Sequence, residues 1–166
     1  MQKSILIILG IAALFALLFA LGSQNPGSVP GGDALTAASA LSVSEDSYDF
    51  GEISMKDGLV RRSFTVTNNA SSTPLILSRI STSCMCTEAF LESNGEKLGP
   101  FGMPGHGGAT RSIREEILAG ESRAVEVVFD PAAHGPAGVG RITRAVFIED
   151  AVGTILTLEI SATVTP

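Results

Sequence analysis

The stretch Thr154–Val164 reads TILTLEISATV and places an apolar side chain at every second position from Leu156 to Val164. Side chains two residues apart along a β-strand lie on the same face of a sheet. The same alternation recurs upstream in VRRSFTVTN (residues 60–68) and AVEVVFD (residues 124–130). It also recurs in residues 141–149, where Arg144 interrupts the apolar face. These patterns predict half-buried strands rather than helices.

Turn-forming residues separate these runs at intervals of about 8–12 residues. We expect a turn at Lys56-Asp57-Gly58 and a hairpin at Asn94-Gly95, and a loop over the glycine-rich stretch 99–108. Short strands with this spacing predict an all-β fold, an immunoglobulin-like antiparallel β-sandwich. A cupredoxin-like Greek key and a jelly roll share the same alternation and stay open as alternatives.

The N-terminus has a different pattern. Residues 5–21 contain neither charge nor proline, and Lys3 precedes them. A positive residue before an apolar run is typical of an export signal. We therefore predict an N-terminal hydrophobic helix over residues 1–22, either kept as a transmembrane anchor or cleaved after Gly22. The run is longer than a typical cleaved signal and slightly short of the roughly 20 residues that span a bilayer.

The remaining chain divides into a linker and a domain. Residues 23–40 are rich in Gly, Pro, Ser and Ala, which predicts a flexible linker. Residues 41–166 hold the strand patterns and form the expected sandwich domain. Export of the chain, with or without cleavage, predicts an extracytoplasmic domain at the cell surface or in the periplasm. The membrane is thus an expected partner, through residues 1–22.

The charge balance argues against nucleic acid as a partner. The chain has 11 basic and 17 acidic residues. Once Lys3 is set aside with the N-terminal segment, 10 basic residues remain and the formal charge is −7. Binding to nucleic acid needs clustered Lys and Arg or aromatic stacking platforms. An acidic domain with one tyrosine and no tryptophan provides neither.

The two cysteines, Cys84 and Cys86, are separated by one residue. In an extended segment their α-carbons would lie about 6.7 Å apart, at the long limit for a disulfide. A disulfide therefore requires a local bend in the chain. Two thiolates on one face also suit a soft metal such as Cu(I) or Zn(II). Inert packing as small buried side chains is the third interpretation.

A metal site would need further ligands, because two cysteines are too few for a closed structural zinc site. Met103 and His106 lie in the glycine-rich stretch, and thioether, imidazole and thiolate are ligands that copper prefers. The candidate metal ligands are therefore Cys84, Cys86, Met103 and His106. His134, the other histidine, is expected to be solvated in a loop between strands.

The order of motifs along the chain resembles a known family. It runs YDFGEI (48–53), STSCMCTEA (81–89), LAGESRAVEVVFDP (118–131) and LTLEISATV (156–164). This order is similar to that of the uncharacterised bacterial Ig-like family catalogued as domain of unknown function fifteen seventy-three, which looks like a relative of major sperm protein and hydin modules. The resemblance covers roughly residues 43–164. It implies the fold and an extracytoplasmic setting, and it brings no activity. Met85 stands where the family's Ser-Cys-Gly-Cys-Thr motif usually has glycine.

The sequence offers no conventional catalytic centre, because no general base is placed beside a nucleophile and no phosphate-binding loop is present. We therefore expect a non-enzymatic, membrane-tethered Ig-like module that binds protein or the cell-envelope surface through its loops or sheet edges. A copper or zinc carrier and a thiol–disulfide exchange protein, each using the cysteine pair, are the alternatives.

Overall fold

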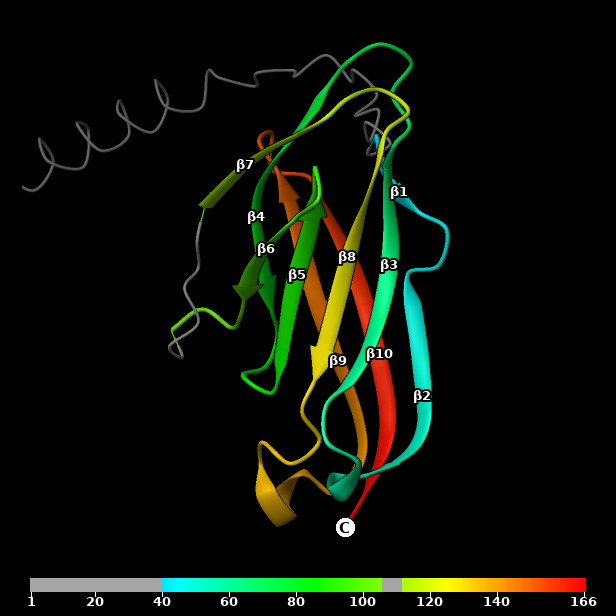
Figure 1. The fold of residues 1–166 in the computed structure, drawn as a ribbon, viewed down its shortest axis with the longest axis vertical. Coiled ribbons are helices and arrows are strands. Elements are labelled where there is room, and N and C mark those ends of the chain that lie inside the picture. Colours follow the sequence, from blue (N-terminus) through cyan, green and yellow to red (C-terminus); the bar gives the residue numbers. More distant parts are fainter. Residues whose placement is uncertain (1–39, 106–111) are drawn as a thin grey trace, which may run out of the picture. The chain divides into compact units, whose positions relative to one another are not determined.

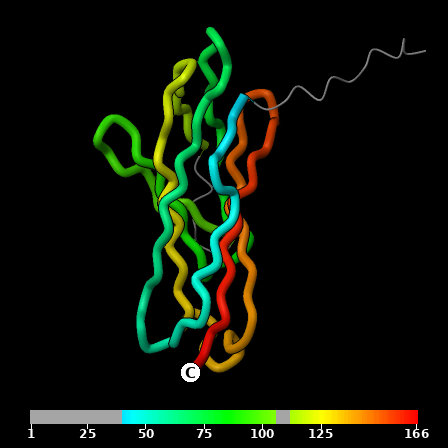
Figure 2. The backbone as a smooth tube through the Cα atoms, turned by 90° about the vertical axis from the view of Figure 1, so that its right-hand side faces the viewer, coloured from blue at the N-terminus to red at the C-terminus, as the bar shows by residue number. Residues whose placement is uncertain are grey.

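The computed structural model describes residues 40–105 and 112–166, which fold into two β-sheets packed face to face (Figures 1 and 2). The predicted helix over residues 1–22, the linker up to residue 39 and His106 lie outside the described residues. Within the described part of the chain, no helix is long and apolar enough to span a bilayer. The all-β prediction is confirmed.

Each sheet has five strands among the described residues. In spatial order, the first sheet contains β1 (Leu41–Val43), β3 (Val60–Asn68), β8 (Ser122–Phe129), β5 (Thr87–Ser93) and β6 (Glu96–Phe101). The second contains β2 (Ser47–Ser54), β10 (Ile155–Thr165), β9 (Gly140–Asp150), β4 (Leu75–Thr82) and β7 (Ser112–Ile117). Two short 3₁₀ helices, η1 (Met55–Asp57) and η2 (Gly135–Gly138), lie in connections at one end of the sandwich (Figure 1).

The prediction of purely antiparallel sheets is wrong at one edge. β2 pairs with β10 in parallel, with Tyr48 opposite Ile160, whereas the other strand pairs are antiparallel. β1 and β2 run in the same direction, and residues 44–46 carry the chain from the edge of one sheet to the edge of the other. A period-two pattern reports which side chains are buried, but not the direction of the neighbouring strand.

The alternating side chains fill the space between the sheets, as predicted. Phe64 and Val66 of β3 and Leu158 and Ile160 of β10 are at most 2% exposed. They belong to one hydrophobic cluster with residues from both sheets. Because burial of apolar surface contributes about 25 cal/mol per Å², this cluster is the main source of stability.

The hairpin and turn predictions hold, whereas the glycine-rich stretch is partly a strand. Asn94 and Gly95 have φ of 50° and 82° and join β5 to β6 in a two-residue turn. Gly99 lies inside β6, where a Cβ would be 2.9 Å from the Ala89 carbonyl oxygen, so only glycine fits. β7 was not predicted, because its SIREEI sequence alternates weakly and lies directly after a presumed loop.

Asn68 is a fully buried polar residue at the end of β3. Its side-chain amide donates to the carbonyl oxygens of Thr73 (3.0 Å) and Ile117 (2.9 Å). Its Oδ1 accepts from the Ala70 backbone N–H at 3.0 Å. One side chain thus satisfies backbone groups of the β3–β4 connection and of β7, and joins the two sheets at this end.

We predict that Asn68→Ala lowers the free energy of unfolding of the 166-residue chain by about 3 kcal/mol, since a buried group that loses its partner costs about 1–3 kcal/mol. Urea unfolding followed by circular dichroism measures this change. The matched control is Asn69→Ala, because Asn69 is exposed and bonds only the Ser42 hydroxyl with its side chain. A similar loss in both variants would contradict the assigned role.

Candidate functional site

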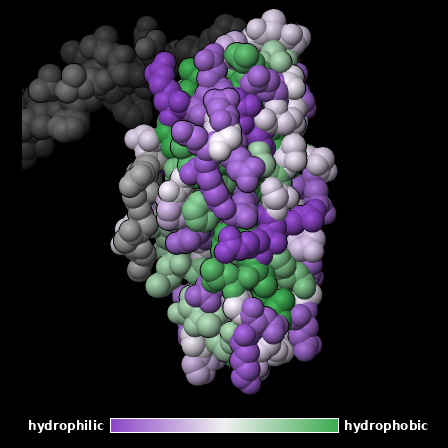
Figure 3. Space-filling model, viewed as in Figure 1, coloured by the Kyte–Doolittle hydropathy of each residue, from purple (hydrophilic) through white to green (hydrophobic). Residues whose placement is uncertain are grey.

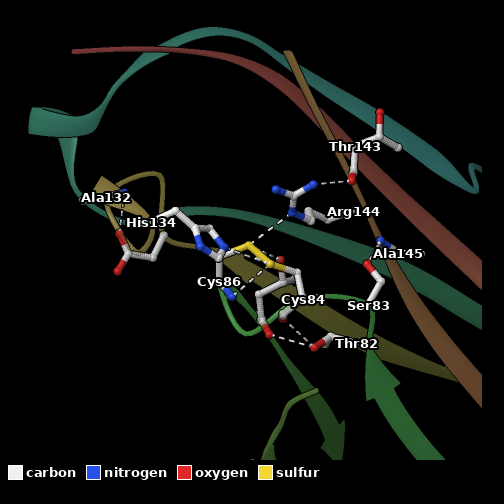
Figure 4. The surroundings of a disulfide bond; sticks show 11 residues. Thr82, Ser83, Cys84, Cys86, Ala132, His134, Thr143, Arg144 and Ala145 are labelled. Atoms are coloured by element: carbon white, nitrogen blue, oxygen red, sulfur yellow. Dashed lines mark hydrogen bonds between the residues drawn. A yellow bond between two sulfur atoms is a disulfide. The ribbon is translucent and has the colours of Figure 1, made fainter. Parts of the chain in front are cut away.

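The cysteine pair lies in the turn between β4 and β5, where a disulfide joins Cys84 and Cys86 (Figure 4). Their α-carbons are 5.3 Å apart, within the usual range for a disulfide. The Thr87 backbone N–H donates to the Cys84 carbonyl oxygen at 3.2 Å, and this turn provides the bend that a disulfide requires. The two cysteines therefore do not lie in an extended segment, and β5 begins only at Thr87.

Side chains on both flanks hold this turn in place. The buried Thr82 hydroxyl lies 3.0 Å from the carbonyl oxygens of both Cys84 and Thr87. Two hydrogen bonds join Ser83 to Ala145 of β9. The Ser83 backbone N–H donates to the Ala145 carbonyl oxygen, and the Ala145 backbone N–H donates to the Ser83 hydroxyl oxygen, each at 2.9 Å. Met85 is not among the described residues with positive φ, so this turn does not need the glycine that usually follows the first cysteine of the family motif.

Each sulfur has its own nitrogen neighbour (Figure 4). His134 Nε2 lies 3.2 Å from Cys84 Sγ, and Arg144 Nε donates to Cys86 Sγ at 3.2 Å. The Arg144 guanidinium is fixed by a second bond, from Nη1 to the Thr143 carbonyl oxygen at 2.8 Å. Arginine stays protonated in proteins, so a permanent positive charge lies against Cys86.

The two side-chain nitrogens come from different segments. Arg144 is on β9, at the position that interrupts the apolar face of Ile142 and Val146. His134 is on the β8–β9 connection, which the Asp130 backbone N–H ties to the Cys86 carbonyl oxygen at 2.9 Å. The sequence signal for Arg144 was a charge at an inward-facing position, which must find a partner. No comparable local signal identified His134.

Solvent reaches the disulfide unequally. Cys84 is half-buried, whereas Cys86 is only 3% exposed. Beside Cys86 lies a hollow of about 250 Å³ lined in part by Leu59, Met85 and Asp130. Leu59 and Met85 are 52% and 54% exposed. Figure 3, which has the same view as Figure 1, shows hydrophobic surface in the lower half of the domain, where β8 ends and β5 begins.

The predicted metal ligands are only partly brought together. Cys84 and Cys86 are adjacent, and the Gly102 carbonyl oxygen accepts from the Thr82 N–H at 3.3 Å, which places the start of the glycine-rich loop near the turn. Within residues 40–105 and 112–166, however, no hydrogen bond joins Met103 to either sulfur. The ligand atoms of Cys84, Cys86 and His134 lie within 4.8 Å of one another. His134 is exposed, as expected, yet its ring reaches the cysteines.

Residues 41–99, which include this turn, match the model of the family described as Protein of unknown function (DUF1573). The resemblance to the DUF1573 family is confirmed. The match ends before β7, so the similarity of residues 100–164 to the family stays a prediction. No curated protein matches the chain.

The chain is similar to several solved structures. A protein of unknown function from Porphyromonas gingivalis W83 is similar with a TM-score of 0.53 and 15% identity, over 74% of this chain and 46% of that one. The secreted serine protease VesC from Vibrio cholerae is similar with a TM-score of 0.48 and 14% sequence identity, over 78% of this chain and 25% of that one. The periplasmic chaperone SfaE is similar with a TM-score of 0.44 and 10% sequence identity, over 76% of this chain and 57% of that one. The chain thus spans less than half of the Porphyromonas protein, and that likeness shows the fold alone.

We predict that, after reduction and at a pH at which both thiols are ionised, Cys84 is alkylated faster than Cys86, because Cys84 is half-buried and Cys86 is enclosed. Brief treatment of the reduced chain with iodoacetamide, followed by peptide mass spectrometry, measures the two extents of labelling. The single variants Cys84→Ser and Cys86→Ser serve as controls for each thiol alone. Faster labelling of Cys86 would contradict the order of exposure.

Proposed function

We propose that this chain is an extracytoplasmic, membrane-tethered, immunoglobulin-like binding module whose Cys84–Cys86 disulfide exchanges with thiols of a partner protein. The observation that carries the proposal is the pairing of each sulfur with a side-chain nitrogen at 3.2 Å, Cys84 with His134 and Cys86 with Arg144. A disulfide that only packs in a core would need neither neighbour. Both neighbours suit a site where charge develops on sulfur.

The exchange begins at the more exposed sulfur. A thiolate of the partner attacks Cys84 Sγ, the Cys84–Cys86 bond breaks, and its electron pair passes to Cys86 Sγ. The Arg144 guanidinium stabilises the resulting thiolate, and a more stable leaving thiolate departs faster. The product is a mixed disulfide between Cys84 and the partner.

A second thiol of the partner completes the reaction. It attacks the partner's own sulfur in the mixed disulfide and releases Cys84 as a thiolate beside His134, and this thiolate then takes up a proton from solvent. The partner dithiol has then lost two electrons and two protons to become a disulfide, and the module has gained them as two thiols. The hollow beside Cys86, with apolar Leu59 and Met85 and the Asp130 carboxylate, would contact the residues that flank the partner's cysteine.

The strand register places the disulfide and Leu41 at opposite ends of the sandwich. Leu41, where the described domain begins, pairs with Asn68 at one end of β3. Thr87, next to the disulfide, and Val60, at the other end of β3, both pair with Phe129. The nine residues of β3 span about 27 Å at the rise of a β-strand. The disulfide therefore lies at the opposite end of the sandwich from Leu41, next to which the predicted linker joins the domain.

We predict that Arg144→Met lowers the reduction potential of the disulfide by about 30 mV, which is a tenfold change in the two-electron exchange equilibrium. The sign follows because the arginine stabilises the reduced, thiolate-bearing form, and its loss makes reduction less favourable. The potential is measured from the fraction of reduced chain in glutathione buffers.

The matched control is Arg141→Met on the same strand, because Arg141 pairs with the exposed Asp49 and does not bond to either sulfur. Its potential should equal that of the unaltered chain. An unchanged or raised potential in Arg144→Met would refute the assigned role of the guanidinium.

For location, we predict that alkaline phosphatase fused after Pro166 is active in a bacterial host, because this enzyme needs disulfides that form outside the cytoplasm. Deletion of residues 1–22 should abolish the activity while the fusion is still produced, as immunoblotting of the cells would show. Activity that survives the deletion would exclude residues 1–22 as the export segment.

A further inference from the structure

We propose that the reduced site binds one Cu(I) ion through Cys84 Sγ, Cys86 Sγ and His134 Nε2. This inference rests on the proposed function only in requiring that the disulfide can be reduced. It goes beyond that function because it assigns a second state of the site, with a ligand of its own. It also assigns the third ligand to His134, in place of Met103 and His106.

The distances allow a single ion to contact all three atoms. The two sulfurs and one imidazole nitrogen lie within 4.8 Å of one another. A metal–thiolate bond is about 2.3 Å long, so one ion among three donors spans separations of about 4 Å. Reduction lets the sulfurs move apart, and Cys84 and His134 both lie in segments at the surface, where small adjustments are inexpensive.

The donor set and its charge favour Cu(I) over Zn(II). Two thiolates and an imidazole are soft ligands, and they provide three donors where a structural zinc site needs four. Two thiolates with Cu(I) leave a net charge of −1, which the Arg144 guanidinium at Cys86 neutralises. With Zn(II) the two thiolates would already neutralise the metal, and the Arg144 guanidinium would remain as an added positive charge beside a nearly buried sulfur.

Binding is controlled by the redox state of the cysteines. In the disulfide both sulfurs are bonded to each other and neither is a thiolate. A partner dithiol reduces the disulfide and itself becomes a disulfide, which leaves two thiols on this chain. Cu(I) then displaces one proton from each thiol as it binds. The site therefore takes up copper only after exchange. The reverse exchange, in which a partner disulfide accepts two electrons and becomes a dithiol, would re-form the Cys84–Cys86 bond and release the copper.

The test uses the full chain in detergent, reduced with dithiothreitol, freed of the reductant under argon and titrated with Cu(I) against a chromogenic Cu(I) chelator. We expect one ion per reduced chain and none per oxidised chain. His134→Ala should weaken binding by about 100-fold or more, since loss of outer-shell partners alone costs about 10–100-fold. Met103→Leu and His106→Ala are the matched controls and should bind like the unaltered chain. Urea midpoints check that every variant is folded, which is expected for the exposed His134.

The inference is overturned by equal uptake in the oxidised and reduced chains, by a His134→Ala affinity within twofold of the unaltered chain, or by displacement of Cu(I) by equimolar Zn(II). The test is separate from that of the exchange function. Copper uptake with an unchanged potential in Arg144→Met would leave the metal site standing and remove the exchange mechanism. A shifted potential without copper uptake would do the reverse.

Discussion

Burial of alternate side chains between two sheets is the constraint on which the rest of the molecule depends. Once Phe64, Val66, Leu158 and Ile160 face inward, the register of their strands is fixed, because a slip of one residue would expose the whole apolar set. Because the strands are fixed, the positions at which each connecting turn begins and ends are fixed as well. The β4–β5 turn is therefore held against β9 through Ser83 and Ala145, and the site inherits its precision from the core.

The disulfide site lies where the apolar pattern of β9 is interrupted by a charged residue. On β9, Ile142, Val146 and Ile148 are buried, but Arg144, on the same face, turns its guanidinium toward Cys86. The β8–β9 connection adds His134 above Cys84. Two sulfurs joined by a tight turn thus face two side-chain nitrogens, from residues that are 50 and 58 positions away in the sequence. Such a combination of a rigid scaffold and variable connections is the usual way in which a sandwich acquires chemistry.

Sequence reasoning found the elements that depend on local pattern and missed those that depend on partners. The alternation in residues 60–68 and the Asn94-Gly95 hairpin were predicted because each is encoded within a few residues. The parallel pairing of β2 with β10 was missed, because strand direction is set by the course of the whole chain. The sequence pointed to the cysteine pair but left a disulfide, a metal site and inert packing open. It predicted a solvated His134, since only the tertiary fold brings this ring to Cys84.

The central claim is that the disulfide reacts through Cys84, with Cys86 as the leaving group beside Arg144. The most direct measurement is to incubate the oxidised chain with glutathione, quench with acid and locate the mixed disulfide by peptide mass spectrometry. The account predicts glutathione on Cys84 and a free Cys86 thiol. Glutathione mainly on Cys86, or no adduct under conditions that reduce the disulfide of an exposed control peptide with the same Cys-Met-Cys sequence, would contradict it.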